Sequence, residues 1–273
     1  MTDANSLSQW WQPQKLALDE CYQATIGPLT LYLKRRQQEW LVSSEYSSDP
    51  DSAYRLQLSQ ATCLPELLAS QRFIFRHSPS GFCLKPRLLD RAVVIKTRQS
   101  VSIPPGEQSV FYISSPLRVE LVLQDPELSL LSLPIQRLSD TWFGANTQQG
   151  ELCYADKTQA RHSKEELPRR VHKAVTPVTV KNNSSQMMSI EKLSLPVPYL
   201  SLYGLADGSL WTDQVLLDHQ DDAELSRLQI SKQMPAGSDG AERLAKPRLY
   251  MEKHGLFRAF SDLFAHAASR GSL

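Results

Sequence analysis

The sequence VSIPPGEQSVFYISSPLRVELVL, from Val101 to Leu123, decides the fold class. Val101 and Ile103 alternate with serines, PPGE has the composition of a tight turn, and apolar residues then recur at every second position. Alternation with a period of two, interrupted by turn residues, is typical of antiparallel strands with one buried face. Residues 175–217 repeat this pattern around an Asn-Asn-Ser-Ser turn at 182–185. The sequence therefore predicts a mainly β protein and names no chemistry.

The same signals continue on both sides of this stretch. Alternating leucines at 29–33 lead into the polar residues 35–38, and Trp40 and Val42 follow, which predicts a first hairpin. Asp207-Gly208 is a strong signal for a second hairpin turn. Prolines near residues 126 and 134 interrupt an apolar run, so we place a domain boundary there.

We expect antiparallel, β-sandwich-like sheets in two domains, closed by one C-terminal amphipathic helix. The adjacent Trp10 and Trp11 should pack an N-terminal arm onto the body of the protein. The predicted segments are the arm (1–26), a first sandwich-like domain (27–134), a second one (135–245) that begins with a long polar connection (135–174), and the C-terminal helix (246–273).

The C-terminal segment has the spacing of a helix. From Leu256 onward, apolar residues recur three and four positions apart, which defines one apolar face. One interpretation is a helix that covers an open sheet edge or a sandwich end of the same chain. The other is a docking helix for a partner or a second subunit, with Phe257, Phe260 and Phe264 as the interaction surface.

Composition limits the classes of partner. Thirty Lys and Arg residues stand against 29 Asp and Glu residues, so the chain lacks the strongly basic character of a nucleic-acid-binding protein. The first thirty residues do not resemble a signal peptide, and no stretch has the roughly 18–20 apolar residues of a membrane-spanning helix. Four scattered cysteines without a C-x-x-C pair argue against a zinc ribbon and for free thiols. We expect a cytoplasmic protein that neither inserts into membranes nor binds nucleic acid.

Local catalytic motifs are missing from the sequence. It contains no phosphate loop, no dinucleotide-binding glycine pattern, no G-x-S-x-G and no H-E-x-x-H. We therefore predict no catalytic residue, no metal and no cofactor. The favoured function is a non-catalytic binding or scaffolding module that acts through contacts with another protein or through self-association.

The polar connection offers an alternative function. Residues 137–172 concentrate aromatic, acidic, basic and glycine residues, which suits a small-ligand sensor or an enzyme for a carbohydrate or an anionic metabolite. Trp142 can stack on a ring, Asp140 can accept a hydroxyl, and an arginine can pair with an anion. The simpler interpretation is that the aromatic residues anchor the core and the charges form a solvated surface. The candidate ligand-binding residues are Asp140, Trp142, Tyr154, Arg161, His162 and Arg169.

Several longer strings resemble an uncharacterised prokaryotic family, a domain of unknown function, over nearly the whole chain. The resemblance rests on Leu138–Gly144, Gly150–Tyr154, Leu195–Tyr203, Ile103–Glu107 and the Phe257–Phe264 segment. It implies a bacterial or archaeal protein of β-rich build with no established activity and no catalytic residues to carry over. It also suggests gene neighbours that encode mechanosensitive channels, and hence a membrane channel as a possible partner.

Overall fold

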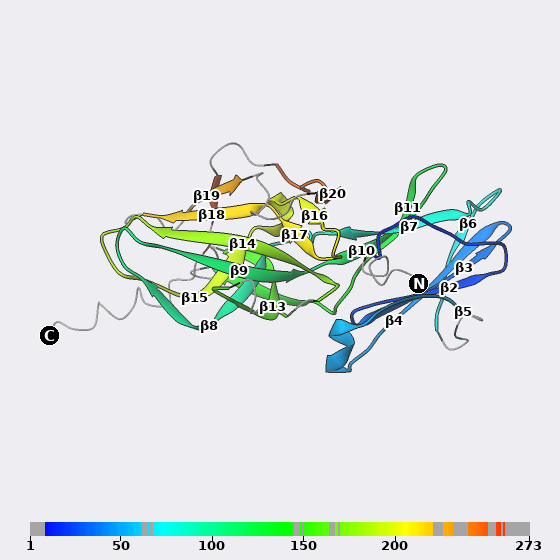
Figure 1. The fold of residues 1–273 in the computed structure, drawn as a ribbon, viewed down its shortest axis with the longest axis horizontal. Helices are drawn as coiled ribbons and strands as arrows, with labels where there is room; N and C mark the ends of the chain where they lie inside the picture. Colours follow the sequence, from blue (N-terminus) through cyan, green and yellow to red (C-terminus); the bar gives the residue numbers. More distant parts are fainter. Residues whose placement is uncertain are drawn as a thin grey trace.

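The structure is a computed structural model that describes residues 9–61, 65, 68–144, 148, 150–163, 167–168, 170–220, 226–231, 240–250, 255–257 and 259. These residues are mainly β, as predicted, with two short 3-10 helices, η2 (Pro50–Tyr54) and η3 (Val197–Tyr199). The strands make four sheets in two stacked pairs, and the molecule is elongated with one pair at each end (Figure 1). Among the described residues, none of the helices has the length and apolar content needed to cross a membrane.

The first sandwich packs sheet A against sheet B. Phe82 of sheet A lies with its ring centroid 5.2 Å from that of Tyr22 and 5.7 Å from that of Trp40, both in sheet B. Sheet A has the order β1 (Gln14–Lys15), β7 (Gly81–Arg87), β10 (Arg118–Leu123) and β11 (Leu128–Pro134). Sheet B has the order β5 (Leu56–Ala61), β2 (Cys21–Ile26), β3 (Leu29–Arg36), β4 (Glu39–Tyr46) and β6 (Gln71–Ile74). The predicted first hairpin is confirmed as β3–β4, with Leu33 opposite Val42.

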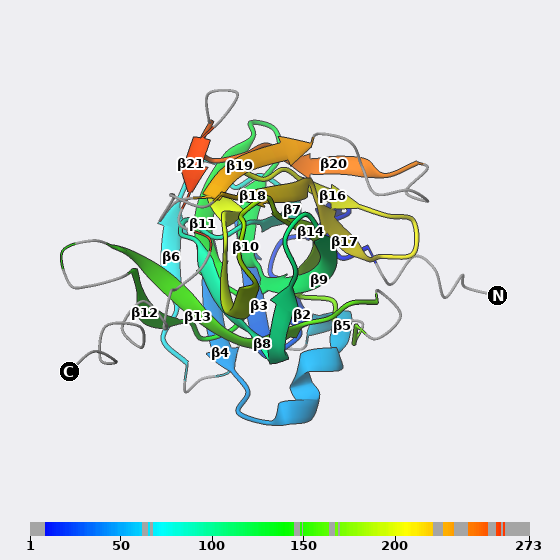
Figure 2. The same ribbon diagram turned by 90° about the vertical axis from the view of Figure 1, so that its left-hand side faces the viewer.

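The second sandwich contains the remaining strands in two layers, which are visible from the end of the molecule (Figure 2). Sheet C has the order β12 (Ser139–Gly144), β13 (Gly150–Ala160), β8 (Val93–Ile103) and β15 (Met188–Leu195). Sheet D has the order β20 (Glu242–Ala245), β16 (Leu202–Gly204), β17 (Leu210–Thr212), β14 (Lys173–Asn182), β18 (Gln214–His219), β19 (Ser226–Ser231) and β21 (Gly255–Phe257), and β9 (Gln108–Pro116) also pairs with β14.

Pairing in the second sandwich is mixed rather than purely antiparallel. Strand β13 runs parallel to β8, and β14 runs parallel to β17 and β18. The predicted hairpin at Asp207-Gly208 is confirmed, because it joins the antiparallel strands β16 and β17.

The two turns that identified the fold do not form hairpins. The turn after Ile103 leads from β8 in sheet C to β9 in sheet D, and the turn after Asn182 leads from β14 in sheet D back to β15 in sheet C. The buried Asn182 joins both turns: its Nδ2 donates to the carbonyl oxygens of Ile103 and Gln186 at 2.8 Å each, and its backbone oxygen accepts from the Gly106 amide at 2.8 Å. Each turn therefore crosses between layers instead of folding a strand back within one sheet.

Strand pairing also crosses the predicted boundary at residue 134. Strands β8 and β9 precede that boundary, yet they pair with β13, β14 and β15, which follow it. The chain thus leaves the first sandwich after β7, adds β8 and β9 to the second, and returns for β10 and β11. In the predicted N-terminal arm, Trp10 and Trp11 are buried, and the Trp10 indole Nε1 donates to the Val171 oxygen at 3.1 Å. The end of that arm is β2, an inner strand of sheet B.

The prediction of a C-terminal helix is wrong at residues 255–257, where the first helical turn was expected. Gly255–Phe257 form strand β21, which pairs antiparallel with β19, so Leu256 lies opposite Arg227. The free edge of β19 offers unpaired backbone groups, and pairing with this edge satisfies the local backbone without a helix. Phe257, predicted as an interaction residue, belongs to this strand, and Phe260 and Phe264 lie outside the described residues.

Candidate functional site

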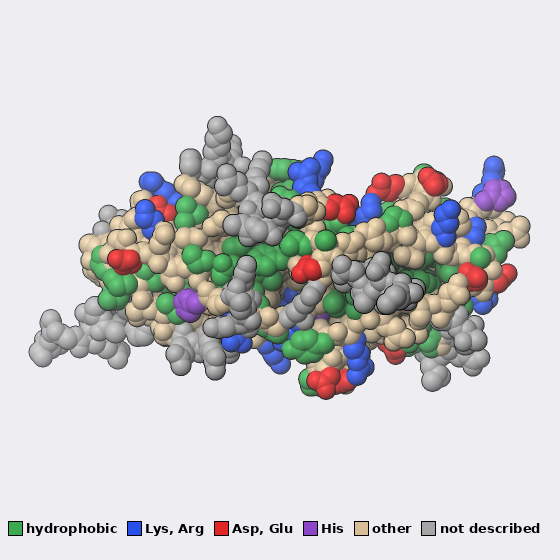
Figure 3. Space-filling view, in the orientation of Figure 1, with side chains coloured by type: hydrophobic (Ala, Val, Ile, Leu, Met, Phe, Trp, Pro, Cys, Tyr) green, Lys and Arg blue, Asp and Glu red, His purple; other side chains and the backbone are tan. Residues whose placement is uncertain are grey.

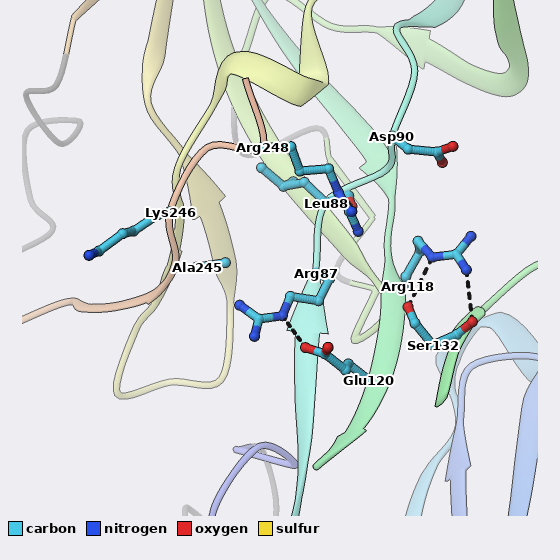
Figure 4. Close-up of a pocket in the computed structure, with 9 residues that line it drawn as sticks. All are labelled: Arg87, Leu88, Asp90, Arg118, Glu120, Ser132, Ala245, Lys246 and Arg248. Atoms are coloured by element: carbon cyan, nitrogen blue, oxygen red, sulfur yellow. Dashed lines mark hydrogen bonds and ion pairs between the residues drawn. The ribbon is translucent and has the colours of Figure 1, made fainter. Parts of the chain in front are cut away.

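A pocket of about 440 Å³ lies where the two sandwiches meet, and we call it the junction pocket (Figure 4). The first sandwich contributes residues at the end of β7, on β10 and on β11. The connection from β7 to β8 contributes two more, and the segment that follows β20 closes the pocket from the second sandwich. The lining residues are Arg87, Leu88, Asp90, Arg118, Glu120, Ser132, Ala245, Lys246 and Arg248.

One cation of the pocket is already neutralised by an acid. Arg87 Nε donates to Glu120 Oε2 at 2.5 Å, and the Ser129 hydroxyl donates to Glu120 Oε1 at 2.7 Å. Burial raises the pKa of the Glu120 carboxyl, but the hydrogen bonds from Ser129 and Arg87 outweigh burial, and the net result is a lowered pKa. Glu120 is therefore ionised at neutral pH and paired with Arg87, and this part of the wall is electrically neutral.

Two other arginines are oriented by neutral oxygen atoms. Arg118 donates from Nε to the Ser132 hydroxyl at 3.0 Å and from Nη2 to the Ser132 carbonyl at 2.7 Å. Arg248 Nε donates to the carbonyl oxygen of Leu88 at 3.0 Å. A carbonyl or hydroxyl fixes a guanidinium group without cancelling its charge, and the always-charged arginine keeps its remaining donors for an anion. The pocket thus contains two positioned guanidinium groups that form no ion pair with a carboxylate of the described residues, although Asp90 also lines the pocket.

The close-up shows how these groups are distributed. In Figure 4 the Arg118 guanidinium group and the Asp90 carboxylate lie on the right, and the Arg248 side chain lies in the middle beside Leu88. Arg87 and Glu120 lie together below Arg248, and the Lys246 side chain extends away from all of them. Arg118 and Arg248 are the groups best placed to share one ligand.

Two residues predicted from sequence lie directly behind the Asp90 wall. Asp140 and Tyr154 face each other across β12 and β13. The Tyr154 hydroxyl donates to Asp90 Oδ1 at 3.1 Å, and burial, followed by the Asp90 charge, raises the pKa of Tyr154. Arg91 lies 3.2 Å from Asp140 Oδ1 and 5.3 Å from the centre of the Tyr154 ring. Tyr154 is therefore a neutral donor that positions Asp90.

The remaining predicted residues lie elsewhere. Trp142 is on the outer strand β12 and is 49% exposed, whereas Arg161 pairs with Tyr112 of β9 just beyond β13. The His162 ring lies 4.9 Å from the Phe111 ring, and Arg169 is outside the described residues. Asp140, Trp142 and Tyr154 share the β12–β13 hairpin, while Arg161 and His162 lie at the other end of β13.

Sequence reasoning missed the arginines of the junction pocket. Arg118 alternates with buried residues along β10, which was a visible sign of an outward-facing position. Its neighbour Arg87 becomes apparent only from the strand register, which places Arg118 opposite Arg87. Arg248 is separated by 160 residues from the Leu88 carbonyl that orients it, so no local pattern indicated their proximity.

A second charged cluster at the junction is closed to solvent. Lys173 Nζ lies 2.8 Å from Asp156 Oδ2, and their side chains are 4% and 3% exposed. The neighbouring His172 is buried beside Gly27 of the first sandwich, and its Nδ1 has no hydrogen-bond partner among the described residues. Burial, followed by the charges of Lys173 and Arg170, lowers the pKa of His172 to about 3. The Lys173–Asp156 pair thus connects sheets C and D of the second sandwich, and only His172 contacts the first sandwich. The paired charges leave none for a ligand.

The thiols of the described residues are not suited to nucleophilic chemistry. Cys83 and Cys153 are buried, and the Cys83 thiol donates to the Trp11 carbonyl oxygen at 2.8 Å. Burial raises the pKa of Cys83 to about 11 and that of Cys153 to about 12. Because the thiolate is the reactive form, these groups are inert at neutral pH.

Comparison with known proteins identifies the family. Residues 10–265 match the model of a protein family of unknown function, DUF432, and the chain belongs to this family. No curated protein and no solved structure matches the chain.

Proposed function

We propose that this DUF432 protein is a non-catalytic binding protein whose ligand is a small anion held in the junction pocket. The observation that carries the proposal is the pair Arg118 and Arg248, which reach one pocket from different sandwiches and are held by neutral acceptors. Positioned arginines without acidic partners are suited to carboxylate and phosphate groups. The pocket volume of about 440 Å³ is in the range of small-molecule sites.

The distribution of charge supports a small ligand over a polyanion. On the face shown in Figure 3, basic and acidic side chains of the described residues are interspersed and form no continuous basic track. The formal net charge is only +1. A nucleic acid would need many phosphate contacts along an extended basic surface. We place this binding activity in the cytoplasm, which the buried Cys83 and Cys153 thiols support, because neither is part of a disulfide bond.

Calorimetric titration tests the proposal. Inorganic phosphate, sulfate and citrate are each titrated into the full-length protein, with sodium chloride at matched ionic strength as the reference. We expect saturable binding of at least one anion, and Arg118→Gln and Arg248→Gln should each weaken it about tenfold or more, because each removes a charge-assisted hydrogen bond. Arg227→Gln, at an exposed site on β19, is the matched control and should bind as the wild type does. Equal affinity in all three variants, or no binding of any anion, would contradict the proposal.

A specific observation also supports the protein-contact function. On β12 and β13, Trp142 lies directly opposite Leu152, and the two side chains are 49% and 45% exposed. Strand β12 is an outer strand of sheet C, and the hairpin lies at the side of the molecule in the end view (Figure 2). An exposed apolar pair on an edge hairpin suits self-association or binding to another protein.

Sedimentation analysis tests self-association through this hairpin. If the contact forms, the wild type should show a concentration-dependent dimer that Trp142→Ser abolishes. Met187→Ser, at another exposed apolar residue (60% exposed), is the control and should leave the dimer intact. A monomer at all concentrations would exclude self-association through this surface.

A further inference from the structure

We infer that the ligand of the junction pocket is a phosphate monoester that carries hydroxyl groups, such as a phosphorylated polyol or sugar. This inference rests on the proposed anion binding and adds the chemical class of the ligand. It follows from the balance of charge in the pocket and from the position of one carboxylate, Asp90.

The charge balance points to a dianion. Glu120 is satisfied by Arg87 and Ser129, so this acid does not neutralise the other side of the pocket. Arg118 and Arg248 remain, each with guanidinium nitrogens that bind no described residue. Apart from the Arg87–Glu120 pair, the lining carries three positive charges, on Arg118, Arg248 and Lys246, against the one negative charge of Asp90. The net excess of two positive charges matches a group that carries between one and two negative charges at neutral pH, as a phosphate monoester does. The three terminal oxygens of such a group also suit two forked donors.

Asp90 limits what can be attached to the phosphate. Its Oδ1 accepts the Tyr154 hydroxyl at 3.1 Å, and Oδ2 accepts no hydrogen bond from the described residues. Tyr154 thereby holds the carboxylate at the pocket wall, where Oδ2 can accept a hydroxyl of the ligand. A second phosphate at this place would be repelled, because an ionised carboxylate is an acceptor only. The wall therefore favours a neutral hydroxylated body over a diphosphate.

The pocket has the size for such a ligand. Its volume of about 440 Å³ exceeds that of a phosphate ion alone and leaves room for a short polyol or a hexose. Leu88 and Ala245 are the apolar residues among the described residues that line the pocket, so a largely hydrophobic ester would bury little apolar surface against them.

Titrations with four probes test the inference: inorganic phosphate, ethyl phosphate, glycerol 3-phosphate and pyrophosphate. In the wild type, glycerol 3-phosphate should bind about tenfold or more tightly than ethyl phosphate, because only the former offers hydroxyls to a charged acceptor. Pyrophosphate should bind more weakly than glycerol 3-phosphate.

Asp90→Asn separates the inference from the proposed function. Asparagine retains an oxygen for the Tyr154 hydroxyl but removes the negative charge. The preference for glycerol 3-phosphate over ethyl phosphate should fall to about threefold or less, and pyrophosphate should bind more tightly than to the wild type. Asp51→Asn, at an exposed position in η2, is the matched control and should keep the wild-type preferences.

Each outcome has a defined meaning. If inorganic phosphate and ethyl phosphate bind as well as glycerol 3-phosphate, or if Asp90→Asn leaves the preference unchanged, the hydroxylated ester is wrong and anion binding stands. If none of the four probes binds, both the inference and phosphate binding in this pocket are overturned.

Discussion

Two charged regions, the junction pocket between the sandwiches and the Lys173–Asp156 pair inside the second sandwich, differ in how their charges are balanced. Lys173 and Asp156 form a buried ion pair in which each charge is met by the other. Arg118 and Arg248 face a pocket and are held by carbonyl and hydroxyl oxygens, which orient them without neutralising them. A buried charge that is already paired stabilises its surroundings only as long as both partners are present. An oriented charge without a paired acid is available to a ligand. The first region is therefore structural, and the second is the binding site that we propose.

Removing one partner of the buried pair should have the largest effect on stability. Lys173→Met leaves the Asp156 carboxylate buried without its cation, and we expect the free energy of unfolding to fall by about 3–5 kcal/mol. Chemical denaturation measures this change. Lys181→Met, on the same strand at a half-buried position, is the control and should change stability by less than about 1 kcal/mol.

The double variant Lys173→Met/Asp156→Leu sharpens the comparison. Because both charges are gone, it should recover most of the lost stability, since replacing a buried ion pair by apolar residues is often close to neutral. A single variant as stable as the wild type would show that solvent reaches the Asp156 carboxylate, and the structural role of the pair would be wrong.

The buried His172 should make stability depend on pH in a defined direction. Its pKa is about 3 in the folded protein, below the ordinary value of 6.5, so between these values the unfolded chain binds a proton that the folded protein does not. Stability is therefore complete above about pH 6.5 and is lost as the pH falls toward 3, by up to a tenfold change in the unfolding equilibrium per pH unit. Denaturation between pH 4 and 7 should show a smaller slope for His172→Leu than for the wild type. Equal slopes would mean that His172 is protonated in the folded protein.

Substitution of Gly27 should lower the free energy of unfolding, because Gly27 packs directly against His172. Its φ is +57°, and a Cβ there would lie 2.5 Å from His172 Nδ1. Gly106 has a similar φ of +77° but open space around it, so it is a matched control. Both Gly→Ala changes introduce backbone strain of about 1–3 kcal/mol, and Gly27→Ala should cost more because His172 must also move. Equal losses of unfolding free energy would show that the two sandwiches adjust without resistance at this contact.

Sequence could predict the strands better than their partners. Alternation of apolar and polar residues identifies β8, β9, β14 and β15, although β14 is buried along most of both faces, and that signal is local. Turn residues report a reversal of the chain but not which sheet the next strand joins, so the sequence did not show that the turns near Gly106 and Asn182 cross between sheets. The same limit applies at the C-terminus, where pairing of Gly255–Phe257 with β19 outweighs a helical spacing.

The candidate site illustrates the same limit. Asp140 and Tyr154 were found because aromatic and charged residues concentrate in one stretch, and they lie beside the pocket through Asp90. The arginines were missed because each is an ordinary polar position on its own. They become a site only when the register of β7 and β10 and the segment after β20 bring them to one pocket.

Ionic strength should affect the two regions differently, and these changes in affinity and stability are the smallest that we expect. Charges that face solvent are screened by salt, and buried pairs are screened much less. Raising sodium chloride from 50 to 500 mM should therefore increase the Kd for phosphate in the junction pocket by about 3–10-fold. The difference in unfolding free energy between the wild type and Lys173→Met should change by less than about 0.5 kcal/mol over the same range, because the Lys173 and Asp156 side chains are only 4% and 3% exposed. Calorimetric titration and denaturation at the two salt concentrations provide both numbers. If the stability difference shrinks with salt as much as the affinity does, the two regions are equally open to solvent, and their division into a structural pair and a binding site fails.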